Sequence, residues 1–337
     1  MDINFIKALL EKIKSGKRIP LPQNCFFTPE GEIVCLERKG GTSRYPYTGS
    51  GILLWAKSNG YISACEGNFN VFREANYNED AVVNFFGGIK TEDRYRPVSI
   101  TGADRISGET GVERYVVYTD EFGYYIAEAG EAVFALRLGT DKNGHMRFTL
   151  GGYNLSGEDK EIYLASYFEP MLRYIEAEGF FNRMTKYGRF SEGKYAFSSF
   201  NACFDSLLIH CRKPERFSEE SHTVSRSEFL GASDRNLANA DSLVNGKFEK
   251  NVYSVNTTHL PAASDIFRIC LPPSGEAVVD YELTVVHGKT ADEVLKDDEE
   301  NAAALIGDFE METDRKIFDN FDMSFEAPEY GDLDPAK

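Results

Sequence analysis

The sequence is poor in the patterns that build metal or phosphate sites. Its five histidines are scattered, without an HxH or HExxH pairing, so their spacing indicates no metal centre. Its six cysteines have no CxxC spacing and lie inside or beside apolar strand patterns, which favours reduced core thiols over disulfides or zinc. No glycine-rich stretch forms a phosphate loop. We therefore expect neither metal nor cofactor. The residues concerned are His145, His210, His222, His259 and His287, and Cys25, Cys35, Cys65, Cys203, Cys211 and Cys270.

Basic residues are also scarce. The 37 Lys and Arg residues face 54 Asp and Glu residues, and the resulting charge of -17 would repel nucleic acid and anionic lipid. No apolar run approaches the roughly 18 residues that a membrane span requires. The first residues, MDINFIKALLEKIKSG, include an early acid and no small-residue cleavage site, so they do not indicate a secretory signal. These features predict a cytoplasmic protein that binds neither nucleic acid nor membrane.

The chain does contain many apolar and aromatic residues in strand-like runs. With 42% hydrophobic and 13% aromatic residues it can bury a large core. Turn signals recur between the runs from Cys25 to about Tyr281, which predicts an all-β fold, a large antiparallel two-sheet sandwich, rather than βαβ units. The runs 131–138, 145–153 and 161–168 are predicted to form a meander.

Helical patterns lie at the two ends of the chain. Residues 2–15 place apolar side chains at helical spacing, and the pattern turns helical again from Thr290. The predicted division is therefore a helical lead over 1–20, the sandwich over 21–289 and an acidic helical linker over 290–337.

Two further segments have distinctive compositions. The stretch from Arg212 to Lys250 is polar and is predicted to be a long mobile loop. The acidic tail carries Phe318, Phe321 and Phe325, which are predicted to pack back on the sandwich or to mediate self-association, because each ring gains roughly 2 kcal/mol on burial.

The segment from Ser43 to Tyr77 holds the only tryptophan among repeated Tyr and Phe residues. Residues 52–56 and 61–65 are predicted to form a hairpin around Asn59-Gly60, a sequence characteristic of tight turns. An aromatic floor with a charged rim suits hydroxyl-rich ligands. The predicted carbohydrate-binding residues are Arg44, Tyr45, Trp55, Tyr61, Glu66, Phe69, Arg73 and Glu74.

Several of these residues also have structural explanations. A lone tryptophan in an apolar run is more often a core residue, so the core is the favoured position for Trp55. Arg73 and Glu74 are adjacent on a strand and point to opposite faces, so one of them is expected to join a structural ion pair. For the loop around Arg44 and Tyr45, functional and anchoring roles remain equally open.

The ordered series of short motifs resembles the N-terminal domain of the inverting phosphorylases of glycoside hydrolase family 94, in particular the 1,2-β-oligoglucan phosphorylases. The resemblance runs from about Gly40 to Ala291. It implies a supersandwich of the galactose mutarotase type, followed by a helical linker and an α/α-barrel that performs the chemistry. The motifs are Ser43–Pro46, Leu54–Ala56, Gly60–Ile62, Glu66–Phe72, Thr119–Gly123, Glu161–Pro170 and Ser227–Gly231.

In the resembled family the catalytic acid and the phosphate site belong to the barrel, so no catalytic residue is expected before Lys337. The resemblance implies a non-catalytic domain of a β-glucan oligosaccharide phosphorylase that shapes the substrate entrance and the subunit interface. Its implied partners are a β-linked gluco-oligosaccharide, the barrel in cis or in trans, and a second copy in a homodimer.

Two alternatives stay open. One is an autonomous carbohydrate-binding module. The other is a mutarotase-like sugar epimerase, which needs a histidine and a carboxylate in one groove. His210 with Asp205 or Glu169 could supply that pair, although a satisfied buried histidine beside Cys211 is the favoured interpretation.

Overall fold

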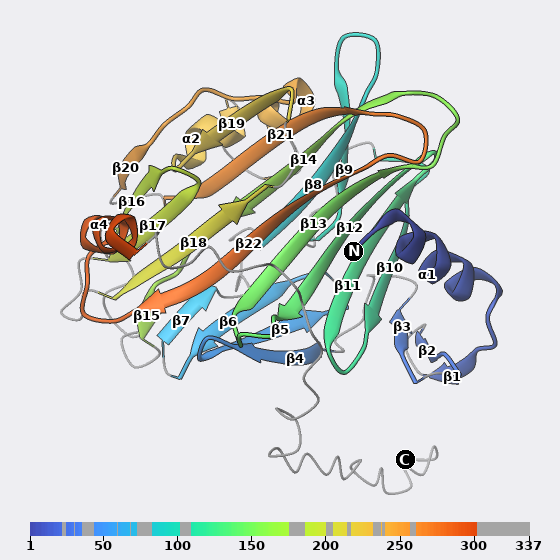
Figure 1. Cartoon of the computed structure of the whole chain (residues 1–337), viewed down its shortest axis with the longest axis horizontal. Coiled ribbons are helices and arrows are strands. Elements are labelled where there is room, and N and C mark those ends of the chain that lie inside the picture. The colour runs from blue at the N-terminus through green and yellow to red at the C-terminus, as the bar shows by residue number, and fades with distance from the viewer. Residues whose placement is uncertain are drawn as a thin grey trace, which may run out of the picture.

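The strands of the protein form three sheets, and every pair of neighbouring named strands is antiparallel (Figure 1). The predicted all-β antiparallel fold is confirmed. The computed structural model describes residues 1–21, 25–29, 31–35, 44–58, 60–67, 69–72, 83–101, 109–174, 186–199, 205–213, 217–231, 237, 240–256 and 261–301.

The large sheet has twelve strands. A strand from the C-terminal part of the chain lies inside it, because β22 is inserted between β13 and β18. From edge to edge its strands are β1 (Ile19–Leu21), β2 (Cys25–Phe27), β3 (Ile33–Cys35), β10 (Glu113–Tyr118), β11 (Phe122–Ala129), β12 (Ala132–Thr140), β13 (Met146–Asn154), β22 (Glu276–Val286), β18 (Ser206–Arg212), β17 (Lys194–Ser199), β16 (Lys186–Ser191) and β20 (Tyr253–Asn256).

Two five-stranded sheets pack against one face of the large sheet. The second sheet runs β19 (Glu219–Thr223), β21 (Ala263–Leu271), β14 (Lys160–Phe168), β8 (Val83–Lys90) and β9 (Tyr95–Ser99). The small sheet runs β15 (Arg173–Tyr174), β7 (Phe69–Phe72), β6 (Ile62–Glu66), β5 (Ile52–Lys57) and β4 (Arg44–Gly49).

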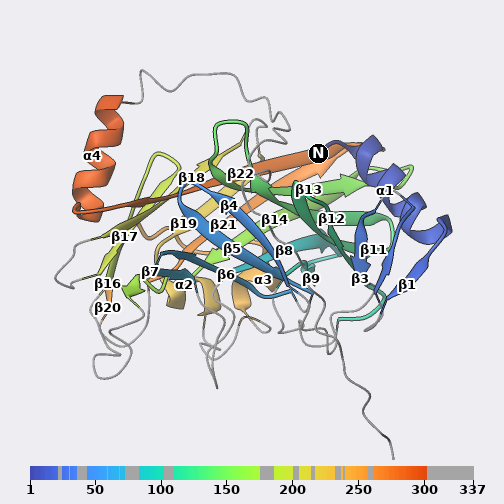
Figure 2. The same ribbon diagram turned by 90° about the horizontal axis from the view of Figure 1, so that it is seen from below.

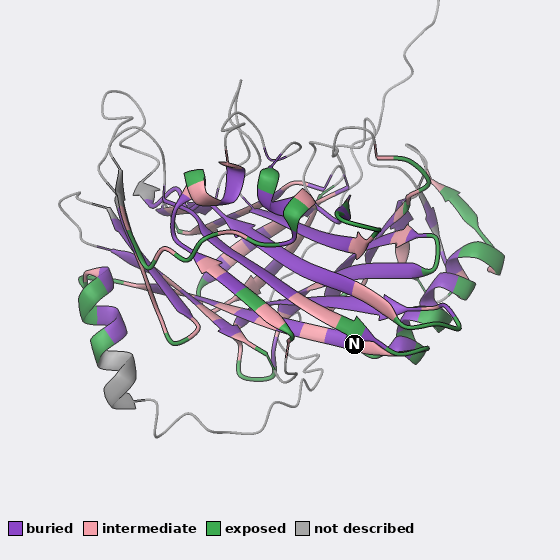
Figure 3. Ribbon diagram, turned by 90° about the horizontal axis from the view of Figure 1, so that it is seen from above, coloured by how far each residue is buried: buried purple, intermediate pink, exposed green. Residues whose placement is uncertain are grey.

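A continuous hydrophobic core lies between the large sheet and the two smaller sheets. Figure 3 shows the buried residues concentrated in the strands. The aromatic rings of this core come close to the backbone of β8, where a Cβ on Gly87 would lie 2.2 Å from the Phe134 ring. Only glycine permits this approach between the sheets.

Four helices are described. α1 (Ile3–Ser15) confirms the predicted N-terminal helix: Asp2 accepts a hydrogen bond from the Phe5 amide at 2.9 Å as its N-cap. Its apolar side packs on the outer face of the large sheet. α4 (Ala291–Asn301) confirms the helical pattern after Thr290 and packs near the other end of that face. α2 (Arg226–Leu230) and α3 (Asp241–Asn245) cover the second sheet on the opposite side of the molecule (Figure 2).

The predicted meander is wrong in its third strand. β12 and β13 form a hairpin around the turn Asp141–Gly144, but β14 pairs with β8 and β21 in the second sheet. The Asn154 amide donates to the carbonyls of Glu158, Leu271 and Pro272 as the chain leaves β13. These bonds fix the crossing from one sheet to the other, which strand periodicity alone does not encode.

The predicted long loop between Arg212 and Lys250 is also wrong for its described residues. It contains β19, α2 and α3. Its few apolar side chains include Phe229, Leu230 and Leu243, which are buried in the cluster that covers the second sheet. A small number of well-placed apolar residues is enough to order a polar segment.

The cysteine prediction holds for Cys35 and Cys211, which are buried free thiols. It is wrong for Cys270, which is exposed, and Cys65 is half-buried. The tail from residue 302 lies outside the described residues, so its three phenylalanines and the predicted division into three parts stay predictions. Among the described helices none has the length and apolar character needed to span a bilayer.

Candidate functional site

The outer face of the small sheet carries the predicted tryptophan. In β5 the side chains alternate, so Ile52, Leu54 and Ala56 are buried while Trp55 and its outward neighbours are half-buried. The favoured core position for Trp55 is therefore wrong, because its place in the alternation turns it away from the interior.

Arg44 lies over the indole ring. Its guanidinium carbon is 4.6 Å from the centroid of the Trp55 ring, and Arg44 is the cross-strand partner of Lys57. Burial and the neighbouring Arg44 charge together lower the pKa of Lys57. The structure thus brings a tryptophan and two cationic side chains together on one outer face.

Tyr45 and Phe69 occupy different environments. Tyr45 stacks on Tyr118 with ring centroids 5.6 Å apart, and its hydroxyl donates to Asp120 at 3.3 Å. Burial and then Asp120 raise the pKa of Tyr45. Phe69 is 1% exposed in the main core, so its ring cannot form part of a surface floor for a ligand.

Two further predicted residues, Tyr61 and Glu66, lie at the two ends of β6. Tyr61 is half-buried, and its carbonyl accepts the Lys57 amide at 3.0 Å to close the predicted hairpin. Glu66 pairs with His287 at 2.8 Å, and the other nitrogen of that imidazole lies 3.3 Å from Asp205. Arg73 and Glu74 lie outside the described residues.

His287 is held between two carboxylates. Burial alone would lower its pKa, but the hydrogen bond to Asp205 and the charges of Glu66 and Asp205 raise it. Because Glu66 belongs to the small sheet and Asp205 precedes β18 of the large sheet, this imidazole links the two sheets.

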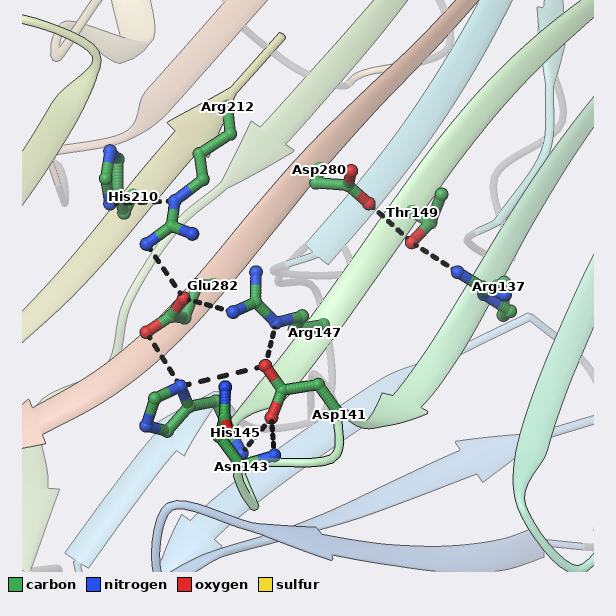
Figure 4. A network of polar contacts seen from close by, with 10 residues as sticks. All are labelled: Arg137, Asp141, Asn143, His145, Arg147, Thr149, His210, Arg212, Asp280 and Glu282. Carbon is green, nitrogen blue, oxygen red and sulfur yellow. Dashed lines mark hydrogen bonds and ion pairs between the residues drawn. The ribbon is translucent and has the colours of Figure 1, made fainter. Parts of the chain in front are cut away.

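A second polar surface was not predicted. On the outer face of the large sheet, between the patches covered by α1 and α4, polar side chains lie in two cross-strand rows on β18, β22, β13 and β12 (Figure 4). We call this surface the charged strip. It consists of Arg137, Asp141, His145, Arg147, Thr149, His210, Arg212, Asp280 and Glu282.

Glu282 and Arg147 form the centre of the charged strip. Glu282 forms ion pairs with Arg147 at 2.8 Å and with Arg212 at 3.4 Å, and it lies 3.3 Å from Nδ1 of His145. Arg147 also pairs through its Nε with Asp141. The Arg147 and Asp141 side chains are each only 5% exposed, so the centre of this ion-pair network is buried, whereas Arg212 and His145 at its rim are partly exposed.

The hairpin turn between β12 and β13 holds the carboxylate end of this network. Asp141 accepts the backbone amides of Asn143 at 2.9 Å and His145 at 2.8 Å. Burial would raise the pKa of Asp141, but the bond from the His145 amide and the Arg147 guanidinium lower it. The turn therefore fixes an ionised carboxylate beside a half-exposed imidazole.

The second row is less charged. Thr149 donates to Asp280 at 2.6 Å and accepts from Arg137 at 3.4 Å. The sequence contained a signal for both rows, because polar residues recur two apart inside apolar strands at Arg147 and Thr149 and at Asp280 and Glu282. Sequence spacing alone could not show that these pairs are neighbours.

The epimerase alternative would pair His210 with Asp205 or Glu169, and the structure gives these three residues other partners. His210 is half-buried and accepts from Arg212 at 3.3 Å, whereas Asp205 contacts His287 and Glu169 contacts Arg226 at 2.6 Å. Strand alternation explains the difference, since buried Cys211 points inward and His210 therefore points outward. Within the described part of the chain, no group of three or more metal-ligating side chains converges.

The molecule is thus a large antiparallel β-sandwich with one aromatic and one charged outer surface. No protein-family model matches the sequence, and no curated protein matches it. Solved structures of similar arrangement include a protein described as a kojibiose phosphorylase from the human microbiome, with 10% identity and a TM-score of 0.39 over 86% of this chain and 36% of that chain.

A polysaccharide lyase has the same TM-score of 0.39 and 10% identity, covering 75% of this chain and 34% of the lyase. A protein from Escherichia coli K12 described as an aldose 1-epimerase has a TM-score of 0.33 and 9% identity, covering 73% of this chain and 99% of that chain. This chain spans about a third of the length of the phosphorylase and the lyase. Similarity at this level assigns no activity to this chain.

Proposed function

We propose that this chain is a carbohydrate-binding β-sandwich that acts as the non-catalytic N-terminal domain of a β-glucan oligosaccharide phosphorylase of the family 94 type. The ordered motifs of the sequence support this proposal. Two of them form strands that build the sandwich: Leu54–Ala56 lies in β5, and Glu161–Pro170 includes most of β14. Its partners would be a β-linked gluco-oligosaccharide and an α/α-barrel in cis or in trans.

The observation that carries the proposal is the position of Trp55. Its indole lies on an outer face rather than in the core, with Arg44 4.6 Å above the ring. Flat aromatic rings pack against the apolar faces of pyranose rings, and a guanidinium provides several donors for sugar hydroxyls. Trp55 and Arg44 would therefore bind the saccharide, with Tyr61 and Glu66 at the ends of β6 as further candidates.

Isothermal titration with 1,2-β-linked gluco-oligosaccharides tests this proposal. We expect saturable binding by the chain and a loss of at least about tenfold in affinity for Trp55→Ala, equal to roughly 1.4 kcal/mol. Tyr253→Ala is a matched control, because Tyr253 is an exposed aromatic residue on a different strand. Equal losses for both variants, or no binding by the chain, would refute the carbohydrate site at Trp55.

The non-catalytic role has its own test. Incubated with the same oligosaccharides and phosphate, the chain is expected to release no sugar 1-phosphate, because the acid and the phosphate site of the family belong to the barrel. Phosphate-dependent release of sugar 1-phosphate would overturn this role. If the chain binds sugar but a co-expressed barrel neither associates with it nor gains activity, an autonomous binding module is the better description.

A second candidate function is a mutarotase-like sugar epimerase. One observation favours it: His145 lies 3.3 Å from Glu282 on an outer sheet face, and such a pair could exchange protons with a sugar ring. Polarimetry of freshly dissolved glucose would show faster anomer exchange with the chain than without it. The effect should disappear in His145→Ala, and an unchanged rate with the unmodified chain excludes this function.

A further inference from the structure

A buried carboxylate orients a histidine at the edge of the sandwich where the large and second sheets meet. Asp265 of β21 has no exposed surface, and it lies 2.6 Å from Nδ1 of His222 on β19. It also accepts from the Tyr195 hydroxyl and, at 3.1 Å, from the Ser166 hydroxyl. A fully buried carboxylate with this set of donors is stable only as long as the donors keep their positions.

The imidazole of His222 is also fixed from both sides. The Phe190 ring stacks on it with centroids 4.8 Å apart and an interplanar angle of 17°, and the Phe267 ring meets it edge-on at 5.5 Å. Since Nδ1 faces Asp265, the other nitrogen, Nε2, is directed toward Glu220 near the surface at 3.4 Å. The protein thus presents one ring nitrogen in a defined direction.

Two lysines lie beside the aromatic rings that hold this imidazole. The Lys213 ammonium contacts Glu220 and lies 5.6 Å from the centre of the Phe267 ring. The Lys250 ammonium lies 5.8 Å from the centre of the Phe190 ring. Two ammonium groups thus lie against the two aromatic rings that hold His222, and the Glu220 and Asp265 carboxylates lie beside them.

We propose that this edge binds an anionic sugar, one that carries a carboxylate or a phosphate, through His222, Lys213 and Lys250. Glu220 shows where an anionic oxygen can bind at this edge. One of its carboxylate oxygens contacts both His222 Nε2 and the Lys213 ammonium. A ligand anion would take the place of this oxygen, and Glu220 is a surface side chain that can move away. The sugar part of the ligand rests on the proposed function; the anion part rests on these contacts alone.

Titration of the full chain with glucuronate, glucose 1-phosphate, inorganic phosphate and glucose tests the proposal. We expect one of the two anionic sugars to bind, glucose not to bind at this edge, and Glu220→Gln to raise the affinity by about tenfold because a competing carboxylate is removed. Lys213→Ala should lower it by a similar factor. Lys213 is partly exposed, so this variant leaves the buried network intact.

Glu219→Gln is the matched control for charge. It removes the same negative charge from the neighbouring position of β19, where Glu219 contacts Arg268 instead of His222. Equal gains in Glu219→Gln and Glu220→Gln, or no binding of either anionic sugar by the chain and by Glu220→Gln, would overturn the proposal. Inorganic phosphate that binds as tightly as glucose 1-phosphate would overturn its sugar part. Neutral oligosaccharides report on Trp55 separately, so the two sites can fail independently.

Discussion

The two outer surfaces of the sandwich use charge in opposite ways. On the charged strip, Arg147 and Arg212 are paired with carboxylates, and the central guanidinium is almost fully buried. On the small sheet, Arg44 and Lys57 are cross-strand neighbours of like charge beside a half-buried tryptophan. A ligand on the charged strip would have to break partly buried ion pairs, whereas a hydroxyl-rich ligand on the small sheet would accept hydrogen bonds from the two cations and cover apolar surface. On this comparison we propose that the charged strip serves stability and that the small-sheet face serves recognition.

The largest effect expected from this comparison is on stability at the charged strip. Arg147→Ala should lower the free energy of unfolding by about 3 kcal/mol or more, because it leaves Glu282 and Asp141 without their shared buried partner. Arg189→Ala is the matched control. Its pair with Asp292 is exposed on both sides, so we expect a loss of less than about 1 kcal/mol in urea denaturation. Similar losses for the two variants would show that the charged strip is an ordinary solvated surface.

A smaller effect should appear on the acid side of the stability profile. The pKa of Asp141 is lowered in the folded chain, so its contribution is present above the unfolded value of about 3.9 and is lost as the pH falls through the folded value. Asp141→Asn should therefore reduce stability at pH 7 and flatten the loss of stability below about pH 4. Parallel acid limbs in thermal melts of the two proteins would contradict this role.

The opposite sign applies to the imidazole that links the sheets. The pKa of His287 is raised in the folded chain, so its contribution is fully present below the unfolded value of about 6.5 and is lost as the pH rises through the folded value. The effect should be modest, because this side chain is largely exposed. An NMR titration should give a lower His287 pKa in Asp205→Asn than in the unmodified chain, and an equal value would remove Asp205 as a partner.

Strand periodicity predicted much of the fold, and the reasons for its failures are specific. The hairpin of β5 and β6 and the helix α1 depend on local signals, Asn-Gly and a repeat of apolar residues, and both were predicted correctly. The position of β14 depends instead on long-range contacts: the hydrogen bonds of Asn154 and the pairing of β14 with β21. Local periodicity contains no information on that choice.

The same limit applies to the sites. The alternation of buried and half-buried side chains along β5 (Ile52–Lys57) places Trp55 outward. The prediction of a core position was wrong because it followed the general tendency of tryptophan to be buried instead. The cluster around His222 could not be predicted, because it combines residues of β16, β17, β19 and β21 that are far apart in the sequence. Only the pairing of the sheets brings those residues together.

The smallest stability effect is expected for the surface assigned to recognition. Trp55→Ala should cost less than about 1.5 kcal/mol, since the ring is only half-buried and its contact with Arg44 contributes about 0.5–1 kcal/mol. Leu54→Ala, its inward neighbour, is the control and should cost about 2–5 kcal/mol. If Trp55→Ala proved as costly as Leu54→Ala in urea denaturation, the tryptophan would be part of the structural core.

The fluorescence of the single tryptophan tests the central claim most directly. Trp55 is the only tryptophan in the chain, so its emission reports on the small-sheet face alone when the excitation is selective for tryptophan. We predict that titration with 1,2-β-linked gluco-oligosaccharides shifts the emission to shorter wavelength and protects it from quenching by acrylamide, with saturation, and that Arg44→Ala weakens both effects. An emission spectrum and a quenching constant that do not change at saturating oligosaccharide would contradict the assignment of this face to carbohydrate recognition.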